Sequence, residues 1–174
     1  MPGMADPNFS TTVTLICEHN DDGALGIIIN RPLTLTLAGL FEQLDVDDPV
    51  ASEESDNAVV AGGPIGTERG FVLHGAEQSY ENTLPVSGAI HLTLSRDVID
   101  AMASGTGPEK SLVALGYAGW GEGQLEQEML ANSWLSVPAT PELVFDTPFA
   151  ERWDSAARTL GIDIASLPTD AGHA

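Results

Sequence analysis

Alternation of apolar and polar positions predicts two strands near the start of the chain. Val13, Leu15 and Cys17 fall on one face of the first strand, at residues 12–17. After a short polar turn comes a continuous β-branched run at residues 26–30, which is typical of a strand buried on both faces. The two segments together predict a hairpin.

Helical spacing follows directly. Apolar side chains recur at i, i+3, i+4 and i+7 over residues 37–44, and Thr34 or Thr36 is placed to cap this helix. Ser95 is a similar cap for a second helix, and Thr147 with Pro148 for the last one. The remaining pattern predicts strands at residues 58–61, 70–74, 90–95, 111–117 and 134–137, and helices at residues 96–104, 124–130 and 149–160.

Hairpins mixed with helices predict an α+β fold with a mixed, largely antiparallel sheet. At 174 residues the chain has the length of a single domain, 1–174. The acidic segment 45–57 has few large apolar groups and is predicted to be a mobile loop. Residues 169–174 are predicted to be a frayed tail.

The charge balance disfavours several classes of partner. Twenty-six acidic residues face six basic ones, which gives a formal net charge of −20. Such a chain repels phosphate at long range, so the composition disfavours direct nucleic-acid binding and docking on anionic lipid. No apolar run is long enough for a membrane span, no secretion signal is visible, and the single cysteine is compatible with a cytoplasmic protein.

A glycine-rich stretch at residues 116–123 precedes a predicted helix, an arrangement that often binds phosphate. Gln124 stands where a P-loop carries lysine, and no base occurs between Lys110 and Arg152. We therefore interpret the stretch as a tight strand-to-helix turn rather than a phosphate cradle. In this interpretation Tyr117 and Trp120 pack over the turn, and Leu125 and Met129 form the buried helix stripe.

The polar turn after the first strand offers several ligating groups. Glu18, His19, Asp21 and Asp22 could approach a metal, but the spacing of an EF-hand is absent and further Cys or His is lacking, so no metal or other cofactor is assigned. Cys17 and His19 would share one strand face as a thiol and a base. The periodicity favours a buried, inert cysteine instead.

Several long motifs follow one another in a fixed order along the chain: DPNF, CEHNDDGALGIIINRP, GGPIGTERGFVLH, LTLSRDV, LGYAGWGEGQLEQEMLANSWL, ERWDSAARTLGID and GHA. With these motifs the chain resembles the YqgE/AlgH family of bacterial proteins, from Met4 to the last residue. This resemblance implies a bifurcated sheet that includes a small closed barrel, surrounded by helices, in a cytoplasmic protein. It implies no established reaction, although the family is labelled in part as transcriptional regulators. The matched polar positions form a candidate ligand or partner surface: Glu18, His19, Asn20, Asn30, Arg31, Arg69, His74, Tyr117 and Gln124.

Family members usually carry an apolar strand ahead of the segment that matches residues 1–9. If this strand is missing here, the resemblance implies an open sheet edge where the strand would pair. The leading functional hypothesis is a non-enzymatic binding or regulatory protein that acts through a protein partner or small ligand. The alternative is a thiol- or ligand-dependent enzyme or redox-responsive protein using Cys17, His19 and His74. A third hypothesis places a carboxylate pocket between the glycines at 62–63 and 116–123, with Arg69 selecting the ligand.

Overall fold

The structure is a computed structural model that describes residues 9–46, 49–50 and 57–161. The strands are β1 (Thr14–Asn20), β2 (Gly23–Ile28), β3 (Pro32–Thr36), β4 (Ala58–Ala61), β5 (Ile65–Gly75), β6 (Thr83–Pro85), β7 (Ile90–Thr93) and β8 (Ser111–Gly121). The helices are α1 (Leu37–Gln43), α2 (Asp97–Ala103), α3 (Gln124–Leu130) and α4 (Arg152–Thr159), with a π-helical turn η2 (Glu142–Asp146) and a 3-10 turn η3 (Phe149–Glu151).

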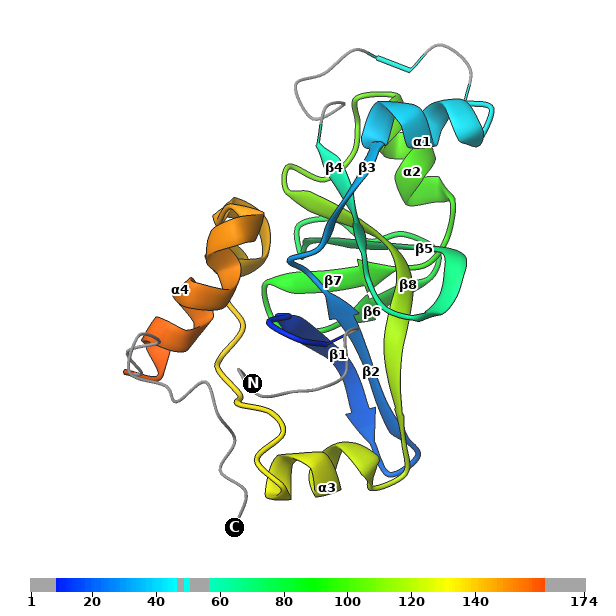
Figure 1. The fold of residues 1–174 in the computed structure, drawn as a ribbon. Coiled ribbons are helices and arrows are strands. Elements are labelled where there is room, and N and C mark those ends of the chain that lie inside the picture. Colours follow the sequence, from blue (N-terminus) through cyan, green and yellow to red (C-terminus); the bar gives the residue numbers. More distant parts are fainter. Residues whose placement is uncertain (1–8, 47–48, 51–56, 162–174) are drawn as a thin grey trace.

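The eight strands form one mixed sheet that divides at β8 (Figure 1). Its main path runs β1-β2-β8-β5-β7-β6, with antiparallel neighbours throughout. β5 pairs with one edge of β8, and two strands share the other edge. The carboxyl-terminal part of β8 pairs with β2 there, and an earlier part of β8 pairs in parallel with β4, which also pairs with β3. The predicted bifurcated, largely antiparallel α+β fold is confirmed, and the sheet is nearly closed into a barrel.

The barrel interior is the main core. Alternate residues of the strands point inward, so that Phe71 and Leu73 of β5 face the interior whereas Val72 packs outside against the helices. The buried interior residues are Leu15, Cys17, Ile27, Ile29, Val60, Phe71, Leu73, Ile90, Leu92, Leu112, Ala114 and Val144.

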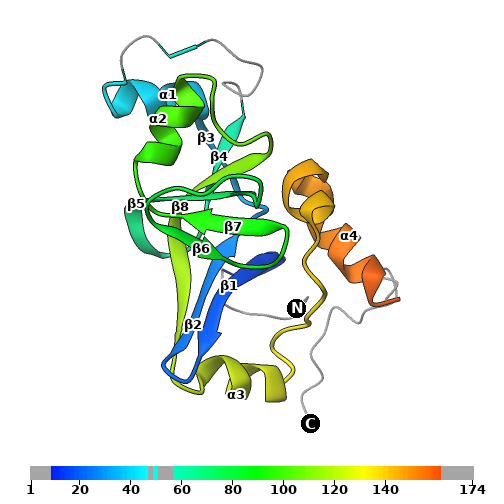
Figure 2. The ribbon, with the colours of Figure 1, turned by 180° about the vertical axis from the view of Figure 1, so that it is seen from behind.

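Helices cover two separate regions of the sheet. α1 and α2 pack together on an outer face through a second apolar cluster that includes Leu40 and Val98. α3 and α4 lie away from them, and the chain between these two helices runs past β1, as Figures 1 and 2 both show. Thr36 caps α1 as predicted, because its hydroxyl accepts a hydrogen bond from the N–H of Gly39 at 3.3 Å.

Several local predictions are wrong. Pro32 follows the predicted hairpin and begins β3, a strand that the pattern does not predict, where it pairs with Val60. Residues 134–137 form no strand. Ser95 does not cap α2 but donates its hydroxyl to the Asp97 carboxylate, and α4 begins at Arg152 after the 3-10 turn rather than directly after Pro148. Of the predicted loop 45–57, residues 47–48 and 51–56 lie outside the described residues, as do residues 169–174 of the predicted tail.

The glycine-rich stretch is mostly strand, not turn. β8 continues to Gly121, and only two residues separate it from α3. Gly116 adopts φ +75° where β8 meets the corner between β4 and β5, and Gly62 donates its N–H to the carbonyl of Leu115 at 2.8 Å. A Cβ on Gly62 would lie 2.3 Å from the Gly116 carbonyl oxygen, so the two glycine segments touch and leave no ligand pocket between them.

Candidate functional site: an apolar groove beside the edge strand

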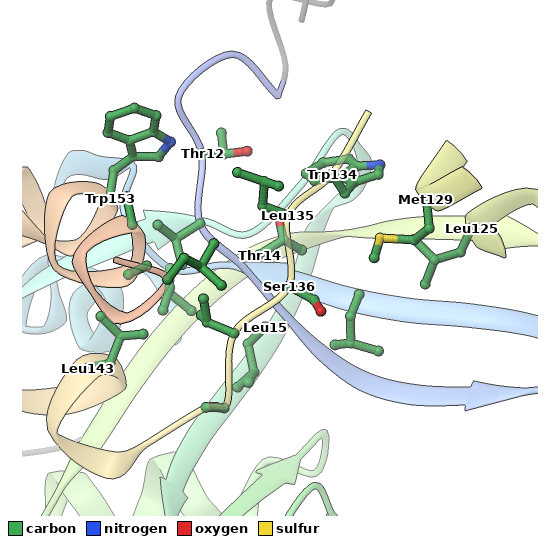
Figure 3. Close-up of a pocket in the computed structure, with 18 of the residues that line it drawn as sticks. Thr12, Thr14, Leu15, Leu125, Met129, Trp134, Leu135, Ser136, Leu143 and Trp153 are labelled. Atoms are coloured by element: carbon green, nitrogen blue, oxygen red, sulfur yellow. The ribbon is translucent and has the colours of Figure 1, made fainter. Parts of the chain in front are cut away.

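An elongated apolar groove of about 750 Å³ lies beside β1 (Figure 3). Leu125 and Met129 of α3 lie at one end, and Leu143 and Trp153 lie at the other. In between, the segment that joins α3 to η2 crosses the front of β1 and contributes Leu135. Its size lies within the usual range of ligand sites.

Exposed apolar side chains are concentrated on this groove. Of the eight large hydrophobic residues that the described chain exposes, four line it, and Leu130 is 84% exposed. The four are Met129, Leu130, Leu135 and Leu160. Clustered exposed apolar groups mark an interaction surface, whereas scattered ones need no explanation. The predicted burial of Met129 is wrong, since this side chain is 36% exposed on the groove.

One carboxylate fixes the wall that α3 forms. Glu128 Oε2 accepts hydrogen bonds from the indole N–H groups of Trp120 (2.9 Å) and Trp134 (2.7 Å). Gln124 donates to the other carboxylate oxygen at 2.9 Å. The two indole rings meet edge to face at 5.8 Å between centroids, and Phe9 completes the cluster. The segment after α3 is therefore held in place although it contains no regular structure.

We expect this wall to loosen in acid. Burial alone would raise the pKa of Glu128, but the hydrogen bonds from Trp134, Gln124 and Trp120 lower it below 4.5. A carboxyl whose pKa is depressed in the folded state stabilises the fold above its unfolded pKa, and this contribution is lost as pH falls through the folded value. The stability that Glu128 adds over Glu128→Gln should therefore shrink as pH falls through the acidic range in which this carboxyl takes up its proton. Urea titrations of both proteins across this range measure it, and a difference independent of pH would contradict the assignment.

β1 is an edge strand along the groove. In the described part of the chain it pairs with β2 alone. The carbonyl of Val13 accepts the N–H of Ile29 at 2.9 Å, and the N–H of Val13 donates to the Asn30 side chain at 2.8 Å. Because backbone groups alternate in direction along a strand, those of Thr14 and Ile16 point to the open side. An open edge offers main-chain groups to an added strand.

A buried polar atom belongs to a residue that lines the groove. Thr14 Oγ1 is the one buried side-chain nitrogen or oxygen in the described residues that has no hydrogen-bond partner, and Thr14 lines the groove. An unsatisfied buried hydroxyl costs about 1–3 kcal/mol.

His19 is the predicted site residue that lines the groove. It stands on the rim, half exposed, and its Nε2 donates to Glu126 Oε1. A hydrogen bond to its own backbone N–H and the His19 contact lower the pKa of Glu126, so this carboxylate is ionised at neutral pH. These two residues are the titratable groups of a mostly apolar lining.

Four other predicted residues support the strands and walls beside the groove. Glu18 accepts a hydrogen bond from the Asn20 amide at 2.9 Å, and Asn20 Oδ1 accepts the N–H of Asp22, which shapes the β1–β2 turn. Asn30 donates to the carbonyl of Thr11 at 3.0 Å as well as accepting from Val13, and Gln124 binds Glu128. Of the turn residues weighed as metal ligands, Glu18 and the backbone of Asp22 thus take part in the hairpin.

The remaining predicted residues lie elsewhere. Arg31 donates to the carbonyl of Ser10 at 3.2 Å. Arg69 is exposed, with no acid of the described chain at ion-pair distance, and Tyr117 packs on Phe71. His74 is fully buried: its Nδ1–H donates to the carbonyl of Gly75, and its Nε2 accepts from Thr93. Burial lowers the pKa of His74 despite the bond to Gly75, so the ring is neutral.

Cys17 is buried in the barrel, as the periodicity predicts. Burial raises the pKa of its thiol to about 12, so almost no reactive thiolate exists at neutral pH. We expect native Cys17 to react with a thiol reagent at least about 100-fold more slowly than the protein unfolded in urea. Stopped-flow labelling with a chromogenic disulfide measures both rates, and a fast native reaction would restore the thiol-based alternative.

Sequence patterns missed most of the groove. The pattern predicts the end of a helix at residues 129–130 and a strand at residues 134–137, whereas the apolar residues of both segments line an open surface. The available signal is Trp134, a large aromatic residue at the start of the predicted strand. Its partners Trp120 and Glu128 lie in two other elements, so the spacing of residues within one element does not reveal this cluster.

The fold and groove together define a barrel-like α+β protein with a surface groove and no assembled catalytic set among the residues described. A model of the AlgH-like family matches residues 1–165, and the chain belongs to this family. A UPF0301 protein of Saccharophagus degradans is 51% identical over 174 residues, which cover all of this chain and 85% of that protein. A second UPF0301 protein, from Thiobacillus denitrificans, is 52% identical, with 100% and 93% covered.

Two solved structures have the same fold. The solution structure of the AlgH protein from Pseudomonas aeruginosa matches with a TM-score of 0.80 and 50% identity, over 100% of this chain and 92% of that one. A crystal structure of a Corynebacterium diphtheriae protein matches with a TM-score of 0.71 at 20% identity, over 90% and 82%, and so shares the fold alone. The family resemblance read from the sequence motifs is confirmed. Among the described residues no helix is long and apolar enough to cross a membrane.

Proposed function

We propose that this protein is a non-enzymatic, cytoplasmic binding protein whose groove takes an extended apolar segment of a protein partner, added as a strand along β1. The single observation that carries this proposal is the coincidence of the open edge of β1 with the apolar groove. Main-chain hydrogen bonds to an edge strand give affinity, and apolar contacts with alternate side chains give selectivity.

The negative charge of the protein favours basic residues on either side of that partner segment. The protein carries a net charge of −20, and Glu126 stands ionised on the groove rim. A partner with lysine or arginine beside its apolar residues is attracted at long range, whereas an acidic one is repelled. The same charge disfavours direct DNA contact, so a role in transcription would be exercised through this protein partner.

Fluorescence polarisation with a labelled synthetic peptide tests the proposal. The probe alternates valine and threonine and has lysines at both ends; the controls carry glutamates at the ends or prolines in place of threonines. We expect the lysine peptide to bind with a Kd below about 100 µM and both controls at least about tenfold more weakly. Leu135→Asp, in the groove, should abolish binding, and Leu94→Asp, an equally exposed leucine elsewhere, should not.

Three outcomes would overturn the proposal. They are equal binding of the proline peptide, unchanged binding by Leu135→Asp, and a dimer in light scattering that Leu135→Asp converts to monomer. The last would assign the groove to a second copy of this chain.

A further inference from the structure

A second cavity, of about 190 Å³, lies on the other side of α4 from the groove. Trp153 and Ala156 of α4 line the groove, whereas Arg152 lines this second cavity. Its other walls come from α1, α2, β4, the start of β8 and the chain around η2 and η3. Polar and apolar groups share the lining about equally, and its larger apolar side chains are Leu37, Val59, Met102, Phe145 and Phe149.

Arg152 is a buried cation without a carboxylate. The residue is only 3% exposed, and its guanidinium donates from Nε to the carbonyl of Thr147 at 2.8 Å and from Nη1 to the carbonyl of Ile29. The Phe149 ring lies 4.4 Å below it. No acid of the described chain forms an ion pair with Arg152; Asp146, on the same cavity, is paired with Lys110. A buried charge without a counter-charge is costly, and burial lowers the pKa of Arg152 to about 10.

The guanidinium keeps free donors beside the cavity. Of its five N–H groups, two are used, so three remain, on Nη1 and Nη2. These can grip one carboxylate through two parallel hydrogen bonds. A phosphate dianion would need more cationic partners than this lining supplies, since Arg152 is its single base.

We propose that this second cavity binds a short-chain carboxylic acid, with the carboxylate on Arg152 and the alkyl chain among the apolar side chains. The missing counter-charge, the free N–H groups and the apolar part of the lining all fit this amphiphilic ligand. This site does not depend on the groove, so an experiment that contradicts one of the two proposals leaves the other standing.

Nuclear magnetic resonance titration of the ¹⁵N-labelled full chain with butyrate tests the site. We expect saturable shifts of the Arg152 Nε–H and Ser111 signals with a Kd of about 1 mM or below. Inorganic phosphate lacks the alkyl chain and 1-butanol lacks the carboxylate, so each should bind at least about tenfold more weakly than butyrate. Butanol binding as well as butyrate, or phosphate binding better, would overturn the assignment.

Variants separate this site from a purely structural arginine. Ser111→Leu fills the cavity and leaves Arg152 with its carbonyl partners, so it should lose at least about tenfold in butyrate affinity while retaining the Nε–H signal. Arg152→Gln should lose binding as well, and Arg158→Gln, on the exposed side of the same helix, should bind like the native chain. Native affinity in Ser111→Leu, or no saturable shift in the native chain, would contradict the proposal.

Discussion

Gly63→Ala should destabilise the protein by more than about 4 kcal/mol and leave little folded material at 37 °C. A Cβ at this position would lie 2.0 Å from the carbonyl carbon of Tyr117 and 2.4 Å from the nitrogen of Ala118. Both are backbone atoms of β8, the strand that joins all branches of the sheet, so neither can move without shifting the sheet. Urea denaturation followed by tryptophan fluorescence measures the loss.

Gly70→Ala is the matched control. A Cβ on Gly70 meets nothing within 4 Å, although this glycine lies in β5, which is paired with the same strand. Alanine should be neutral or stabilise by up to about 1 kcal/mol, because it restricts the unfolded chain. Similar losses in both variants would show that the close backbone contact at Gly63 is not what stabilises the corner.

Arg152→Met should cost about 3 kcal/mol or more in free energy of unfolding. The change keeps most of the side-chain volume but leaves the carbonyls of Thr147 and Ile29 without their donor. Each buried acceptor that loses its partner costs about 1–3 kcal/mol. Thermal and urea unfolding give the loss; Arg158→Met, which is exposed on the same helix, should stay within about 0.5 kcal/mol of the native chain. Equal stability of the two variants would mean that Arg152 does not hold α4 to the sheet.

Predictions from the sequence succeeded where short-range chemistry decides the structure. The β1–β2 hairpin follows from alternation and the Asn20–Asp22 turn, and α1 follows from its apolar stripe and Thr36. The family motifs added the bifurcated sheet, which periodicity alone does not contain. β3 was missed because its pairing with β4 is a long-range contact that Pro32 concealed.

The candidate site was mostly out of reach for the same reason. The groove exists because the irregular segment after α3 is held by Trp134 on Glu128 and passes β1, more than a hundred residues earlier in the chain. In the sequence Arg152 is one of five arginines. Nothing in its neighbours indicates that its side chain is buried and bound to the carbonyl of Ile29. His19 was found because the motif around it was polar, although its partner Glu126 was not foreseen.

The central claim is that a partner segment adds to the open edge of β1, and backbone amides report this directly. Amide hydrogen exchange of Thr14 and Ile16, with and without the lysine-flanked peptide, is the decisive measurement. We expect the peptide to slow exchange at both amides at least about tenfold, because new inter-strand hydrogen bonds protect them, while Val13 and Leu15 change little. Bound peptide with unchanged exchange at Thr14 and Ile16 would contradict strand addition.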